Sequence, residues 1–209
     1  WGNLWKEAKA AQHQKGYQQA YRSMEAAAKD TEGEMLFYQS KVCEGVFHRI
    51  SSGTTRDGLE VFGKMEKGYL LSVDSNWDMY GDGYLSGHYF SEGALREQLE
   101  KAYPGLVFTE EPVENQINMY KRDKVGHILF LTVGNKTISG EEFRQLLELP
   151  SSNFTMQAAD GKIRFLCKGQ GHGLGLSQYG GNVLAKEGKS YKEILRYYFP
   201  ECGVQKKDS

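Results

Sequence analysis

Glycine occupies every second position from residue 169 to residue 175, within the segment GQGHGLGLSQYGG at 169–181. A residue without a Cβ atom adopts left-handed backbone conformations freely and allows other chain segments to approach closely. The segment must therefore either turn tightly or lie directly against a partner. The residues around it predict a preceding strand at 162–168 and a following helix at about 177–186.

A glycine-rich loop between a strand and a helix can bind phosphate through the amides of the helix N-terminus. This loop has no Gly-Lys-Ser/Thr ending, and no acidic residue follows about twenty positions later in a βαβ context. We therefore exclude a nucleotide site.

Three polar side chains stand in this loop: His172, Ser177 and Gln178. A Ser/His pair suggests a hydrolytic nucleophile, but no Gly-x-Ser-x-Gly sequence surrounds Ser177, and an acidic group beside His172 would also be required. Ser177 is equally well placed to cap the following helix, and His172 to anchor the loop by hydrogen bonds. Both alternatives stay open at this point.

The rest of the chain predicts short strands interspersed with helices. Apolar runs predict strands at 35–38, 42–47, 117–120, 127–133, 154–157 and 162–168. Helical spacing and capping residues predict helices within 1–30 (divided near Gly16), at 91–101, from 139, and at 190–199. We expect an α+β fold: a single domain of antiparallel strands and hairpins with packed helices, at residues 17–204. A helical extension at 1–16 and a tail at 205–209 would flank it.

Composition excludes several classes of protein. The 209 residues include three cysteines, Cys43, Cys167 and Cys202, without a Cys-x-x-Cys pair, which excludes a disulfide scaffold and a cysteine-rich zinc module. No run of 18 apolar residues is present, so no membrane span is predicted. The net charge is −1, and no aromatic-basic motif or zinc finger indicates nucleic acid as a partner. Because Cys167 alternates with Ile163 and Phe165, we expect it in the core.

The segment 169–181, with the following NVLAKEGKSYKEILRYYFPECGV, resembles the C-terminal signature of the sporulation stage II protein D family, which includes the amidase-enhancer proteins. Further segments resemble other elements of that family in the same order: DTEG at 30–33, FHRISSGTT at 47–55, YLLSVDSNWD at 69–78, and SGEEFRQLLELPSSNF at 139–154. The resemblance covers residues 17–204.

The resemblance implies a peptidoglycan lytic transglycosylase, which cuts the β-1,4 bond after N-acetylmuramic acid in peptide-free strands and leaves a 1,6-anhydro sugar. One carboxyl group protonates the glycosidic oxygen and then accepts the proton of the sugar's 6-hydroxyl, so its pKa must be raised by a poorly solvated site. The family carries this glutamate in a Glu-Met-Pro-type segment that is not in this sequence, and we leave the catalytic residue unassigned. Because the sequence begins at Trp1, we expect a processed or trimmed protein.

Some relatives bind zinc through a His-x5-Cys-x5-Cys arrangement at the turn that contains His48. Thr54 and Glu60 stand at the two cysteine positions here, so we expect no metal, and we expect no other cofactor. The expected partners are peptidoglycan glycan strands and, as a further candidate, a cell-wall amidase. The expected location is outside the cytoplasm, either secreted or anchored to the membrane.

The resemblance also predicts which side chains surround one polar groove for a glycan strand: His48, Ser52, Ser72, Asp74, His172, Ser177, Gln178 and Tyr179. We expect most of a lytic transglycosylase, active only when the missing glutamate segment is present, so this chain alone should bind strands weakly without cleaving them. The alternative is a non-catalytic peptidoglycan-binding module or amidase activator, and a Glu-Met-Pro segment upstream of Trp1 would distinguish the enzyme from it.

Overall fold

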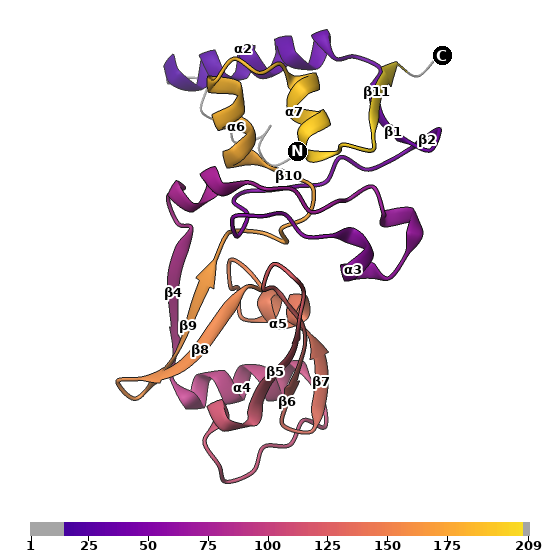
Figure 1. Ribbon diagram of the computed structural model, residues 1–209. Coiled ribbons are helices and arrows are strands. Elements are labelled where there is room, and N and C mark those ends of the chain that lie inside the picture. Colours follow the sequence, from indigo (N-terminus) through magenta and orange to yellow (C-terminus); the bar gives the residue numbers. More distant parts are fainter. Residues whose placement is uncertain (1–14, 207–209) are drawn as a thin grey trace. The chain divides into compact units, whose positions relative to one another are not determined.

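The structure is a computed structural model that describes residues 15–206 of the chain, and these form two compact units (Figure 1). One unit holds the described residues up to Cys43 together with those from Gly203 onward, and the other holds Glu44–Cys202. Helices and small, mainly antiparallel sheets make up both units, which confirms the α+β class. The domain boundaries expected at residues 16 and 204 stay predictions.

The first unit consists of one helix and a three-stranded antiparallel sheet. Its elements are α2 (Lys15–Asp30), β1 (Glu34–Tyr38), β2 (Lys41–Val42) and β11 (Gly203–Lys206), with the strand order β11-β1-β2. Gln39 and Ser40 have left-handed φ angles of 48° and 63°, which suit the two-residue turn of a β-hairpin. The strands predicted at 35–38 and 42–47 do begin a hairpin here, although the second strand ends at Val42 and is shorter than expected. The helix expected before Gly16 lies outside the described residues.

The second unit contains three sheets. The strands β3 (Phe47–His48) and β10 (Leu176–Ser177) form a parallel pair. The antiparallel sheet β4-β9-β8 consists of Leu85–Phe90, Lys162–Lys168 and Phe154–Ala159. The antiparallel sheet β5-β6-β7 consists of Ile117–Arg122, Ile128–Val133 and Lys136–Ser139. The strands predicted at 154–157 and 162–168 are therefore confirmed and form a hairpin, and β6 is the central strand of its sheet.

Helices surround these sheets. The α-helices are α3 (Gly58–Phe62), α4 (Glu92–Ala102), α5 (Gly140–Leu146), α6 (Gln178–Lys186) and α7 (Tyr191–Tyr198), and the 3-10 helices are η1 (Met65–Lys67), η2 (Asn76–Tyr80) and η3 (Val113–Gln116). None of the helices between residues 15 and 206 has the length and apolarity that crossing a bilayer requires.

Side-chain caps fix where the helices begin. The Ser91 hydroxyl accepts the Ala94 N–H at the start of α4. Ser139 and Ser190 each form a reciprocal capping box with a glutamate three residues later, at the starts of α5 and α7. The starts predicted at these three serines are confirmed, because a polar side chain that satisfies an orphan N–H is a local signal.

The hydrophobic core of the second unit centres on three phenylalanines from different elements. The ring centroids of Phe143, Phe154 and Phe165 lie 5.4–5.8 Å apart, and all three side chains are buried. Cys167 is fully buried beside them, which confirms its predicted core position. Burial raises the pKa of its thiol to about 11, so this cysteine is a packing residue.

The alternating glycines turn the chain tightly against its own strands. Gly169, Gly171, Gly173 and Gly175 have φ angles of 77°, 107°, 77° and 68°. A Cβ atom at Gly171 would lie 2.8 Å from the Cβ of His48, and one at Gly175 would overlap the carbonyl oxygen of Val46. Both uses of glycine, left-handed backbone and close approach, therefore operate in this loop.

We predict that Gly175→Ala lowers the free energy of unfolding by about 3 kcal/mol, since it combines left-handed strain with steric overlap. Gly188 provides the matched control, because its φ is also left-handed, at 88°, but a Cβ there meets open space. Gly188→Ala should cost only about 1 kcal/mol. Urea unfolding monitored by circular dichroism measures both, and equal losses would show that the close approach to Val46 is unimportant.

Candidate functional site

A cavity of about 440 Å³ opens in the second unit, within the usual size range of small-molecule sites, about 300–1,000 Å³. Four polar residues line it: Arg56, Ser139, Glu141 and His172. The other seven lining residues are all apolar: Val46, Val61, Phe62, Ile128, Leu129, Phe130 and Leu174. The cavity thus joins α3, β6, the start of α5 and the glycine-rich loop.

A buried ion pair supports one side of this cavity. The Arg56 Nε atom donates to Asp123 Oδ2 at 2.6 Å, and the two side chains are only 4% and 1% exposed. Arg56 Nη1 also donates to the His172 carbonyl oxygen at 3.1 Å, and Asp123 Oδ1 accepts the His127 N–H at 2.8 Å. The pair therefore connects the segment before α3, the turn before β6 and the glycine-rich loop.

His172 is a neutral side chain at the cavity wall. Its Nδ1 atom accepts the N–H of Leu174 at 3.1 Å, so the proton of the neutral ring lies on Nε2. Burial lowers the pKa of His172; the Glu141 carboxylate and the Phe47 carbonyl oppose this shift, while Arg144 and Arg56 add to it. A neutral imidazole whose Nδ1 is already occupied suits binding and positioning better than acid catalysis.

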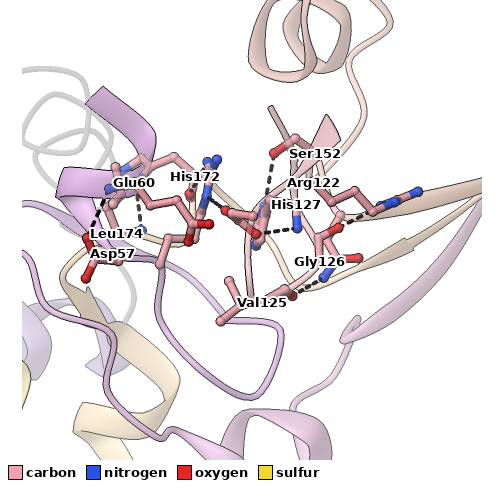
Figure 2. Close-up of polar contacts among 12 residues, drawn as sticks. Asp57, Glu60, Arg122, Val125, Gly126, His127, Ser152, His172 and Leu174 are labelled. Carbon is pink, nitrogen blue, oxygen red and sulfur yellow. Dashed lines mark hydrogen bonds and ion pairs between the residues drawn. The ribbon is translucent and has the colours of Figure 1, made fainter. Parts of the chain in front are cut away.

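His127 lies behind the ion pair and is fully buried. Figure 2 shows its contact with Ser152, whose Oγ lies 3.0 Å from Nδ1. Its Nε2 lies 3.5 Å from Ser52 Oγ. Burial lowers its pKa well below the usual value, and the nearby Arg56 charge adds to the shift. The ring is therefore a neutral link between two serine-containing segments.

His48 stands next to His172, with ring centroids 5.9 Å apart. Its Nδ1 donates to the Leu174 carbonyl oxygen at 3.0 Å, whereas Nε2 is buried without a partner among the described residues. Burial lowers the pKa of His48 to about 4, so the ring is neutral at pH 7.

Asp78 connects the loop after β3 to the start of α6. Its carboxylate accepts the Ser51 N–H at 2.7 Å and the Ser177 hydroxyl at 2.8 Å. The Ser177 oxygen in turn accepts the Gly180 N–H, and the side chain is fully buried. Ser177 is thus a helix cap whose hydroxyl is directed to Asp78 and not to His172, an arrangement that gives no support to a Ser/His hydrolase.

The structure brings some of the eight predicted site residues together. Ser177 is opposite His48 in the β3–β10 pair, and His172 adjoins His48. Ser52 lies beside His127 instead. Tyr179 is half-buried, and its N–H donates to the Arg49 carbonyl.

The other three predicted residues are exposed. The Ser72 hydroxyl donates to the Thr55 carbonyl oxygen at 2.6 Å, Asp74 pairs with Thr54 in an isolated bridge, and Gln178 begins α6. Of the eight residues, His172 lines the cavity described above. The single groove through all eight therefore stays a prediction.

Sequence reasoning missed Arg56, Asp123, Glu141, Phe62 and Phe130 as site residues. Glu141 was interpreted only as part of a helix start, and Phe130 only as part of a buried strand. Phe130 is 41% exposed in that strand, and this exposure follows from tertiary packing, which periodicity does not record. Arg56 immediately follows the segment FHRISSGTT, which resembles the family. Of the five missed residues, it is therefore the one for which the sequence offered a weak signal.

Between residues 15 and 206, no three His, Cys, Asp or Glu side chains gather in a way that could hold a metal ion. The expectation of a metal-free chain stays a prediction.

Comparison with known proteins gives relatives over most of the chain. Stage II sporulation protein D of Bacillus amyloliquefaciens is 30% identical over 193 residues, which cover 92% of this chain and 54% of that protein. Its counterpart in Bacillus subtilis (strain 168) is 27% identical over 194 residues, with the same coverage. The amidase enhancer of Bacillus subtilis (strain 168) is 32% identical over 88 residues, or 42% of this chain and 12% of that protein. The chain spans about half the length of the two sporulation proteins, and no family model matches it.

We predict that Asp123→Asn lowers the free energy of unfolding by about 3–5 kcal/mol, because it leaves the Arg56 charge buried without a counter-charge. The matched control is Glu44→Gln, which removes an exposed ion pair with Lys67 and should cost at most about 1 kcal/mol. Chemical denaturation at pH 7 compares the two variants, and a loss at Asp123 no larger than the control's would refute the role of the pair.

Folding stability should fall in acid because of His48. The unfolded ring binds its proton near pH 6.5 and the folded ring only near pH 4, so its contribution is complete above about pH 6.5 and is lost as the pH falls toward 4. The loss is about 3 kcal/mol. His48→Asn keeps a donor for Leu174 but does not titrate. We expect the change in unfolding free energy between pH 7 and pH 4 to be smaller by that amount in this variant, and an unchanged pH dependence would contradict the prediction.

Proposed function

Because the chain belongs to the stage II sporulation protein D family, we propose that it binds the glycan strands of peptidoglycan and takes part in cutting them as a lytic transglycosylase, outside the cytoplasm. Both the sporulation proteins and the amidase enhancer among its relatives support a cell-wall-related function. That this chain binds glycan strands and takes part in cleaving them is our proposal.

The observation that carries this proposal is the make-up of the cavity. Phe62 and Phe130 line it yet remain 45% and 41% exposed, which is how aromatic rings are presented to the apolar faces of sugars. Arg56, Glu141 and His172 add polar groups fixed by hydrogen bonds within the protein. A mostly apolar wall with a few fixed polar groups is typical of ligand sites.

The described residues bind and position the strand in this proposal, and none of them is assigned as the acid/base. His172 is neutral, since burial lowers its pKa, and the Glu141 carboxylate accepts two hydrogen bonds from Arg144. The lytic reaction requires a carboxyl group that is protonated near neutral pH. We therefore propose that a carboxyl group other than Glu141 performs the proton transfers.

We further propose that the exposed residues Ser72, Asp74 and Gln178 contact the strand beyond the cavity, together with the partly exposed Ser52 and Tyr179. The fully buried Ser177 and the buried His48 would act by holding the glycine-rich loop in place, because their side chains are closed to solvent.

Cosedimentation with peptide-free glycan strands tests the proposal, with cellulose as a β-1,4-linked control polymer and mass spectrometry of the soluble products. We expect retention on the glycan and not on cellulose. Products ending in a 1,6-anhydro sugar would establish cleavage by this chain, and retention without them would support binding alone. No retention on the glycan strands would overturn the proposal.

The similarity to an amidase enhancer favours a second function, the activation of a cell-wall amidase. A purified amidase acting on intact peptidoglycan, with and without the chain, tests it. A higher rate of peptide release without any 1,6-anhydro product would favour activation over cleavage, and an unchanged rate would exclude it.

A further inference from the structure

Building on the proposed function, we propose that the 440 Å³ cavity receives the 2-acetamido group of a peptidoglycan sugar. Its N–H would donate to the Glu141 carboxylate, and its methyl group would lie against the apolar wall. Both sugars of peptidoglycan carry this group, so the cavity would recognise the chemistry that distinguishes these strands from cellulose.

The charges around the cavity favour a neutral ligand. Arg56 is neutralised by Asp123, and Glu141 by Arg144, whose Nη2 atom is 2.5 Å from Glu141 Oε1. His172 is uncharged because burial lowers its pKa. An anion entering the cavity would meet Glu141, and a cation would meet Arg56. A neutral group with one donor avoids both repulsions.

Among the polar side chains that line the cavity, one acceptor atom has no hydrogen-bond donor among the described residues. The Ser139 hydroxyl is used within its capping box, Arg56 donates to Asp123 and to His172, and His172 Nδ1 accepts from Leu174. By contrast, Glu141 Oε2 is buried and has no partner among the described residues. Glu141 lines the cavity, and a carboxylate can accept about four hydrogen bonds, so it can accept a ligand N–H while it keeps those from Arg144.

The remaining walls match the rest of the acetamido sugar. Val61, Ile128 and Leu174 provide aliphatic surface for a methyl group, and the exposed rings of Phe62 and Phe130 stand at the cavity for the sugar ring. A ligand with one amide N–H next to one methyl group thus satisfies both the vacant acceptor and the apolar wall. A plain hydroxyl would satisfy only the acceptor.

Calorimetric titration of the full chain with three tetrasaccharides tests this directly. Chitotetraose carries acetamido groups, cellotetraose carries hydroxyls at the same carbon, and the fully deacetylated chitosan tetramer carries ammonium groups. We expect chitotetraose to bind at least about tenfold more tightly than the other two, because neither analogue carries the acetyl methyl group that would fill the apolar wall, and the ammonium group would also meet the Arg56 charge. Equal binding of chitotetraose and cellotetraose, or tighter binding of the chitosan tetramer, would overturn the assignment.

Two substitutions on α3 provide a matched pair for the location of the site. Val61→Trp fills the cavity, whereas Leu59→Trp adds the same ring at an exposed position of the same helix that does not line it. We expect at least about tenfold weaker chitotetraose binding for the first and no change for the second. Circular dichroism checks that both variants fold. If Val61→Trp does not fold, Phe62→Ala, at an exposed position of the cavity lining, replaces it. Weaker chitotetraose binding by Phe62→Ala would support the site, and unchanged binding would overturn it.

The same variants separate this inference from the proposed function. If Val61→Trp folds and binds peptide-free glycan strands and chitotetraose as tightly as the parent, the cavity assignment is wrong and strand binding stands. If the parent chain binds no glycan strand, the proposed function fails as well.

Discussion

The candidate site depends on one buried ion pair. Arg56 and Asp123 are both nearly inaccessible to water and are joined at 2.6 Å. Burying either charge alone is costly, so the two segments that carry them must meet in one arrangement. Arg56 extends this constraint to the glycine-rich loop through the His172 carbonyl, and Asp123 extends it to the backbone of His127. The walls of the cavity are therefore positioned by electrostatics as well as by packing.

The three histidines around this pair show how burial determines their chemistry. His48, His127 and His172 all have lowered pKa values, and burial is the main cause in each case. Each ring also has an Nδ1 partner in Leu174 or Ser152. Such rings hold loops together without carrying charge, so the charges at the cavity wall are those of the paired Arg56 and Glu141 side chains.

Much of the local structure could be predicted from the sequence because its causes are local. The caps at Ser91, Ser139 and Ser190 and the turns at the alternating glycines each depend on a few neighbouring residues. The cavity could not be predicted in this way. Glu141 and Phe130 had ordinary explanations as parts of a helix start and a strand, and their place in a cavity arises only when distant segments pack together. A family resemblance indicated the glycine-rich loop and His48, but not the ion pair beneath them.

The contacts that build the site have a consequence for how the protein folds. The hydrogen bonds from His48 to Leu174 and from Arg56 to His172 join residues 126 and 116 positions apart. Closing such long loops is entropically expensive and slows folding. During synthesis, His48 and Arg56 must remain without these partners until the glycine-rich loop has emerged from the ribosome. The site is thus assembled late, and until then the aromatic and apolar residues of α3 and β6 are open to a chaperone or to aggregation.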